Sequence, residues 1–193
     1  MATLHNVTAL FSLTFLLLIT PLSSSSSSSS SAGVEVTRTL VTENVVKDIC
    51  YQSEASGICL KLMKSIPQIG KVDLEGLAQI MIHMGSNRTH QTLVRLHSLF
   101  KKTNDSVLKK RYAMCSKLYG LIFDEFKEVS TSLSNGEFTL MNQETWVAVT
   151  FAIACQDQFT HPPSDPSRVL MQGLPTHLYL CNIIFIIVKM LNP

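Results

Sequence analysis

The sequence predicts an all-α protein: an antiparallel four-helix bundle behind an N-terminal helical hairpin, stapled by disulfides. Apolar residues recur at spacings of three and four over long stretches, which is the period of an amphipathic helix. Glycine, proline and asparagine separate these stretches, and no segment alternates apolar and polar residues as a half-buried strand does. Five cysteines lie within or beside the expected helices.

The first 31 residues are expected to be a secretory signal peptide and a serine tract. Leu10–Pro21 is an almost unbroken apolar run, and nine serines follow from Ser23 to Ser31. A short apolar run ending in small residues is typical of a signal peptide and is too short to span a bilayer comfortably. An uncleaved N-terminal anchor is the alternative. We expect residues 32–193 to form one domain.

Two short helices are expected next, at Thr39–Ile49 and Leu60–Ile66, with Pro67 ending the second. The residues between Cys50 and Cys59 are a polar bend, so a pair formed by these neighbouring cysteines would close a helical hairpin.

Four longer helices should form the bundle. The first begins after the N-cap Asp73 and runs to about Phe100, although its polar middle, Ser86–Thr92, could instead be a loop that splits it. We prefer one continuous helix.

The second long helix has the clearest pattern in the chain. It starts after a cap at Asn104 or Asp105 and ends at Asn135–Gly136. Its buried seam should consist of Leu108, Tyr112, Cys115, Tyr119, Ile122, Phe126, Val129 and Leu133.

The third long helix should span Thr139–Phe159, and the prolines of His161–Ser167 should form a rigid turn. The last helix begins near Ser167 or Leu174 and ends near Leu191. We expect it to be a buried terminal helix, because its apolar stretch is too short to span a membrane.

Cys115 and Cys155 occupy seam positions on successive long helices. They would face each other at similar heights if these helices are antiparallel, as a bridge requires. A secreted protein is expected to form disulfides, but five cysteines leave one thiol over and counting alone does not choose the pairs. Cys181, beside Leu178 and Phe185, fits a buried inert thiol, with a reactive or intermolecular thiol as the alternative.

Charge and motifs argue against nucleic-acid binding and catalysis. The net charge is +2, and the densest basic segments, 101–102 and 109–111, lie near helix ends, where cations complement backbone carbonyls or stay solvated. No HExxH, GxSxG, GxGxxG or Walker-type loop occurs. His83, His90 and His97 share a helix face but neighbours are roughly 10 Å apart, too far to bind one metal ion. The acidic cluster at 124–128 fits exposed helix charge, so we expect no enzyme, metal or cofactor.

Several segments together resemble the plant invertase/pectin methylesterase inhibitor family. They are the cysteine-closed hairpin, LKKRYAMCSKLY around Cys115, ACQDQF around Cys155, DLEGL at 73–77, and PPSDPS ahead of Cys181. The resemblance covers about residues 39–191. It implies disulfides Cys50–Cys59 and Cys115–Cys155.

The resemblance also implies a function. We expect a secreted, monomeric inhibitor in the apoplast or cell wall that binds pectin methylesterase or acid invertase non-covalently over the active-site cleft. Its contacts should lie on the hairpin and on the polar side of the second and third long helices. Our candidate contacts are Asn142, Gln143, Thr150, Gln156 and Asp157. Asn87 and Asn104 begin glycosylation sequons.

The third long helix departs from the family pattern. The positions that keep it are Ala148, Thr150, Cys155, Asp157 and Phe159. The positions that depart are Trp146 and Val147 in place of Ser-Ala, Phe151 and Ile153 in place of commonly polar residues, and Ala154 in place of threonine. This apolar surface could be a changed recognition face or could pack within the bundle. A helical binding module that has lost inhibition is therefore the alternative function.

Overall fold

The computed structural model describes residues 39–163 and 169–193, and the side chains of 169–174 are left out of the description. The six helices of this part are α1 (Glu43–Gln52), α2 (Ser56–Lys64), α3 (Leu74–Lys102), α4 (Ser106–Ser134), α5 (Phe138–Asp157) and α6 (Val169–Leu191). No strand occurs among the described residues, which confirms the all-α prediction. The expected signal peptide and serine tract, and part of the proline-rich turn, lie outside this description.

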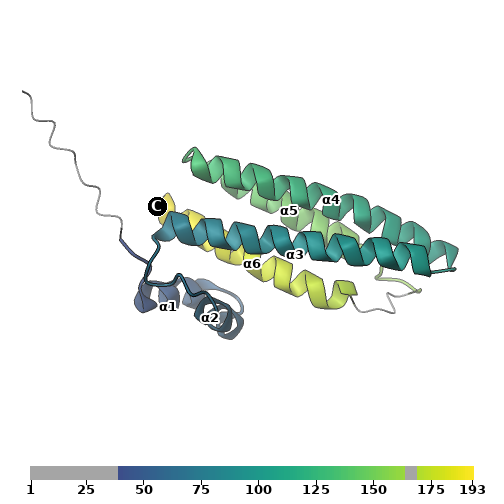
Figure 1. The fold of residues 1–193 in the computed structure, drawn as a ribbon, viewed down its shortest axis with the longest axis horizontal. Helices are drawn as coiled ribbons and strands as arrows, with labels where there is room; N and C mark the ends of the chain where they lie inside the picture. The colour runs from purple at the N-terminus through teal and green to yellow at the C-terminus, as the bar shows by residue number, and fades with distance from the viewer. Residues whose placement is uncertain (1–38, 164–168) are drawn as a thin grey trace, which may run out of the picture. The chain divides into compact units, whose positions relative to one another are not determined.

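Helices α3 to α6 form the four-helix bundle (Figure 1). Only three residues, Thr103–Asp105, connect α3 to α4, and three more, Asn135–Glu137, connect α4 to α5. Connections this short make consecutive helices antiparallel neighbours. Helix α3 contacts α4 and α6, and α5 contacts the same two helices, so α3 and α5 lie diagonally across the bundle. Helices α1 and α2 form the hairpin, and α1 contacts α6.

Helix α3 is continuous, so the alternative of a loop at Ser86–Thr92 is wrong. Thr89 and Thr92 are buried, and their hydroxyls donate to the carbonyls of Gly85 and Arg88, one turn back, at 2.9 and 3.0 Å. These polar side chains are therefore satisfied inside the helix and do not interrupt it.

Helix α1 begins later than the sequence predicted, and helix α2 begins earlier. Thr39–Val41 is not helical, because the N–H of Val41 donates to the carbonyl of Val72 at 2.8 Å and ties this segment to the loop before α3. Thr42 then caps α1, which continues through Cys50 to Gln52. The polar bend is consequently short, and α2 starts at Ser56, before Cys59.

The caps of α4 are those that the sequence predicted, with Asp105 and not Asn104 at the N-terminus. The Asp105 carboxylate accepts from the N–H groups of Val107 and Leu108 at 2.8 and 2.9 Å. Gly136 has φ 71° just beyond the C-terminus, a conformation that favours glycine.

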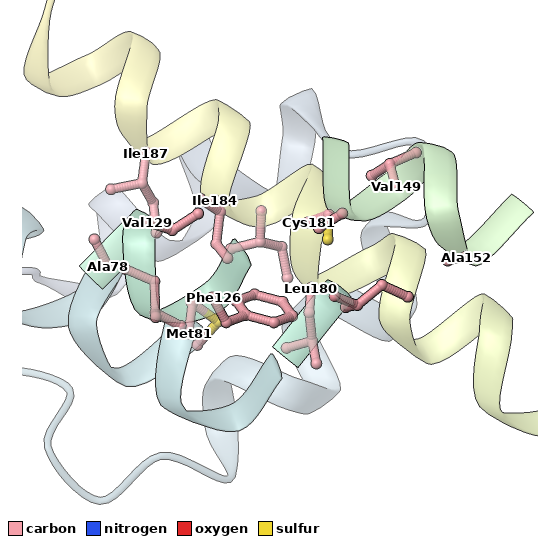
Figure 2. Packing of buried hydrophobic residues seen from close by; sticks show 14 of the residues in the cluster. Ala78, Met81, Phe126, Val129, Val149, Ala152, Leu180, Cys181, Ile184 and Ile187 are labelled. Atoms are coloured by element: carbon pink, nitrogen blue, oxygen red, sulfur yellow. The ribbon is translucent and has the colours of Figure 1, made fainter. Parts of the chain in front are cut away.

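The core is the seam of α4 packed between its neighbours. All eight predicted seam residues of α4 are buried. Figure 2 shows Phe126 among Met81 of α3 and Leu180 of α6. The ring of Phe126 lies directly against the backbone of α3 at Gly85, where a Cβ atom would overlap it. Glycine is therefore required there by close approach of the ring, although it lowers helix propensity.

Both disulfides that the resemblance implies are present. Cys50–Cys59 closes the hairpin with a Cα–Cα distance of 5.3 Å, and Cys115–Cys155 joins α4 to α5 at 4.9 Å. All four cysteines are buried, so each bridge belongs to a packed interface.

Arg111 fastens the turn after α5 to α4. Its guanidinium donates to the carbonyls of His161 at 2.7 Å and Pro162 at 3.3 Å, and also to that of Pro163. The sequence did not predict this role, because the carbonyls that Arg111 binds belong to the turn after α5 and not to the helix end beside which the segment 109–111 lies.

Gly85→Ala should destabilise the protein despite the better helix propensity of alanine. Overpacking against Phe126 costs about 1–3 kcal/mol, while the propensity gain is about 1 kcal/mol. Gly120→Ala in α4 is the matched control, since its Cβ would meet nothing within 4 Å. We expect this control to raise the urea midpoint. A higher midpoint for Gly85→Ala as well would contradict the close packing of Phe126.

Removing the α4–α5 disulfide should cost more stability than removing the hairpin disulfide. The two loops span 40 and 9 residues, for which chain entropy gives about 4 and about 2.7 kcal/mol. Melting of Cys115→Ala/Cys155→Ala and Cys50→Ala/Cys59→Ala proteins tests this. Equal or reversed losses would count against the expectation.

Candidate functional site

The outer face of α5 carries a row of polar side chains. Gln143, Thr150 and Asp157 recur every seven residues and are all exposed. Two helical turns separate neighbours, so the row lies along one face with a spacing of roughly 10 Å. The structure thus brings together three of the five candidate contacts. The opposite face of the helix supplies Met141, Thr145, Ala148, Ala152 and Cys155 to the core.

The other two candidate contacts lie off this row. Asn142 is half-buried and lines a groove between α5 and α6 together with Trp146, Phe185 and Lys189. Gln156 is exposed beside the C-terminal end of α5. Since Asn142 lies at the edge of the row, it can extend a contact surface toward α6.

Exposed apolar side chains flank the polar row, a feature that the sequence left open. Trp146 is 57% exposed and Ile153 is 42% exposed, and each is three or four positions from Thr150 on the helix surface. The Trp146 ring rests on Phe185 of α6, with centroids 5.1 Å apart. Phe151 is half-buried and packs against the core. Trp146 and Ile153 are therefore accessible at the surface, whereas Phe151 packs within the bundle.

The edge where α5 meets α4 is acidic. Glu144 is partly buried there and accepts a hydrogen bond from the Ser132 hydroxyl at 3.0 Å. Desolvation raises the pKa of Glu144, and repulsion from Glu128 and Glu125 adds to this effect, while the Ser132 bond opposes it. The pKa of Glu125 is raised by burial first and by its acidic neighbours second.

The histidines of α3 lie on its outer surface. His83, His90 and His97 are exposed on α3, as expected of a solvated face. In the described ranges, no group of three or more His, Cys, Asp or Glu side chains is placed to hold a metal ion. The described helices also include none with the length and apolar character needed to cross a membrane.

Two ionisable groups lie buried on α6. Cys181 is free and fully buried, and burial raises the pKa of its thiol to about 12, so it stays protonated. His177 is 2% exposed and lies one turn earlier, with Nε2 3.8 Å from the Cys181 sulfur. Burial lowers the pKa of His177 to about 4, although a hydrogen bond to the backbone of Ala148 acts in the opposite direction. These features favour the inert thiol over the reactive one.

A family model for plant invertase/pectin methylesterase inhibitors matches residues 44–177, a span that contains both disulfides and the whole of α5. The chain belongs to this family. A pectinesterase inhibitor from Actinidia deliciosa is 28% identical over 148 residues, covering 77% of this chain and 80% of the relative. The cell wall / vacuolar inhibitor of fructosidase 2 from Arabidopsis thaliana is 28% identical over 149 residues, covering 77% and 79%.

Solved structures of the family have the same fold. A crystal structure of a mutant form of a pectin methylesterase inhibitor from Arabidopsis aligns with a TM-score of 0.67 and 25% identity, covering 74% of this chain and 93% of that one. A second pectin methylesterase inhibitor, from Arabidopsis thaliana, aligns with a TM-score of 0.60. Family and fold together support an inhibitor of pectin methylesterase or invertase.

The buried histidine should make this inhibitor less stable as the pH falls. His177 stays neutral in the fold, whereas in the unfolded chain it takes a proton at its ordinary pKa of 6.5. Stability is therefore lost progressively between pH 6.5 and pH 4, by about 3 kcal/mol at the lower limit. Unfolding by urea across this range, compared with His177→Phe, measures the contribution.

In the His177→Phe protein, the free energy of unfolding should decrease less steeply as the pH falls from 6.5 to 4. Glu125 and Glu144 change stability in the opposite direction, because their raised pKa values favour the fold at lower pH, but they are common to both proteins. Parallel curves for the two proteins would show that His177 contributes nothing to the pH dependence.

Proposed function

We propose that this protein is a secreted inhibitor that binds a cell-wall carbohydrate enzyme, pectin methylesterase or acid invertase, non-covalently over its active-site cleft. It has no chemistry of its own and excludes substrate by occupancy. The observation that supports this most directly is the outer face of α5, where the exposed row of Gln143, Thr150 and Asp157 is flanked by exposed Trp146 and Ile153.

This face has the composition of a protein-binding surface. Tryptophan is enriched among the residues that contribute most binding energy, and polar side chains form the rim around such anchors. The hydroxyl of Thr150 donates to the Trp146 carbonyl at 2.9 Å, which leaves its oxygen lone pairs available to a partner. Because Cys115–Cys155 fixes α5 to α4 behind this face, little conformational entropy should be lost on binding.

The expected glycosylation site on α3 leaves this face open. Asn87 is exposed on α3, and Asn104 is exposed in the turn between α3 and α4. Since α3 lies diagonally across the bundle from α5, a glycan at Asn87 would not cover α5. A glycan at Asn87 is thus compatible with docking through α5, and modification of Asn87 and Asn104 belongs to the proposal of secretion.

Two features bear on the choice between the two target enzymes. Residues 135–138 lack the Pro-Lys-Phe element of invertase inhibitors that block the active site, which favours pectin methylesterase. Ala154 stands where the family usually has threonine, and this difference argues against pectin methylesterase. Both enzymes therefore belong in the test.

The deciding experiment titrates the oxidised, folded mature protein against plant pectin methylesterase and acid invertase at mildly acidic pH. Saturable loss of activity of one enzyme is expected. Flat activity in both titrations, with circular dichroism showing an intact helical fold, would favour the helical binding module without inhibitory activity.

Thr150→Arg should weaken inhibition at least tenfold, because a long charged side chain would stand in the middle of the contact face; this corresponds to about 1.4 kcal/mol or more. His97→Arg, on the exposed face of α3, is the matched control and should leave the inhibition constant within about twofold. Inhibition constants from the same titration measure both. Equal losses from the two variants would exclude α5 as the docking face.

A further inference from the structure

The outer surface of α4 carries a row of exposed apolar side chains, which we call the α4 stripe. Its members are Val107, Met114 and Leu121, which are 44%, 45% and 45% exposed. A spacing of seven residues returns to nearly the same side of a helix, so the three side chains lie in one line. The core seam of α4 lies on a different side of the helix. The α4 stripe therefore takes no part in holding the bundle together.

One charged side chain lies on each flank of the α4 stripe. Lys110 follows Val107 by three residues, which places it on one flank. Glu125 follows Leu121 by four residues, which places it on the other flank. Lys110 is exposed and Glu125 is half-buried. The stripe thus has a cation near one end and an anion near the other, on opposite sides.

These two charges are not neutralised within the described part of the chain. The ion pair of the acidic segment joins Asp124 to Lys127 at 2.8 Å, and Lys110 and Glu125 form none with a described residue. Burial raises the pKa of Glu125, and repulsion from Glu128 and Asp124 adds to this effect. A cation supplied by a partner on this flank would relieve the repulsion.

The α4 stripe and its flanking charges are symmetric about the midpoint of the segment 107–128. Met114 and Leu121 lie equally far from this midpoint, and so, farther out, do Lys110 and Glu125. A two-fold axis through the midpoint and perpendicular to the helix reverses the helix direction and exchanges the two flanks. It therefore places Met114 opposite Leu121 of a second copy. The same rotation places Lys110 opposite Glu125 of that copy.

We propose that the α4 stripe binds the same stripe of a second copy of this chain, with the two α4 helices antiparallel about this two-fold axis. Such an interface is self-complementary, so each contact forms twice. A parallel arrangement would instead bring like charges to the same height along the helices, which disfavours it. The monomer expected from the sequence is then the form at low protein concentration.

Sedimentation equilibrium of the folded, oxidised protein at low salt tests the proposal. The mean mass should rise from that of one chain toward that of two as the concentration increases from roughly 1 μM to roughly 1 mM. High salt should weaken the dimer, because it screens the two ion pairs. A mass of one chain over the whole range would overturn the proposal and leave the stripe to a different protein. No enzyme is present, so the result is independent of the proposed inhibitory function.

Charge reversal tests the antiparallel register. Lys110→Glu and Glu125→Lys should each weaken the dimer about tenfold or more, because each places like charges opposite each other twice. An equal mixture of the two variants should associate within about twofold of the unchanged protein, since each copy then supplies the charge that the other lacks. Lys101→Glu makes the same change on α3 and is the matched control. Two folded variants that fail to associate when mixed would overturn the register.

Leu121→Asp tests the apolar contact without touching either charge. It should weaken the dimer about tenfold or more, because two buried contacts with Met114 are lost at once. Val94→Asp is the matched control, since Val94 is 54% exposed on α3 and lies outside the stripe. Both substitutions are at the surface, so circular dichroism should show an unchanged helical fold. Equal losses in the two variants would mean non-specific association and would contradict the proposed interface.

Discussion

Helix α4 lies between two neighbours, and the packing of its seam determines the rest of the bundle. On one side the ring of Phe126 presses against the α3 backbone at Gly85, and on the other Cys115 is bonded to Cys155 of α5. Tight packing of this kind tolerates little change in volume. The register of α3 and α5 relative to α4 is therefore set by one ring and one covalent bond.

Within helix α5, the residues that pack in the core are different from those that we propose for recognition. The inward side of α5 meets α4 and α6 through small or apolar residues such as Ala148 and Ala152, which are almost completely buried. Its outward side carries Gln143, Thr150 and Asp157, which take no part in the core. The side chains that we propose as target contacts are thus displayed on a scaffold whose core does not include them.

The sequence predicted the fold well wherever periodicity and caps agreed. The eight seam positions of α4, its cap at Asp105 and its end at Gly136 were all visible as spacing and residue type. The predicted start of the first hairpin helix was wrong because a backbone pairing between Val41 and Val72, distant in sequence, holds Thr39–Val41 out of the helix. Local propensity contains no information about such a contact.

The candidate site was predictable only in part. A spacing of seven places Gln143, Thr150 and Asp157 on one face, but periodicity could not distinguish exposed Trp146 from half-buried Phe151, since both lie in an almost uniformly apolar stretch. A cavity lined by Arg88, Tyr119 and His177 depends on residues from three helices. No spacing within one segment reports such a combination.

The guanidinium of Arg111 has a consequence for how the turn after α5 can diversify. It binds three successive backbone carbonyls, those of His161, Pro162 and Pro163, and also lies over the Phe159 ring, 5.9 Å from the ring centroid. Any residue type provides a backbone carbonyl, so these three hydrogen bonds do not require polar side chains in the turn. Insertions or grafted peptides placed beyond Pro163 would start from a fixed point, which makes this connection a suitable position for engineering new loops into the scaffold.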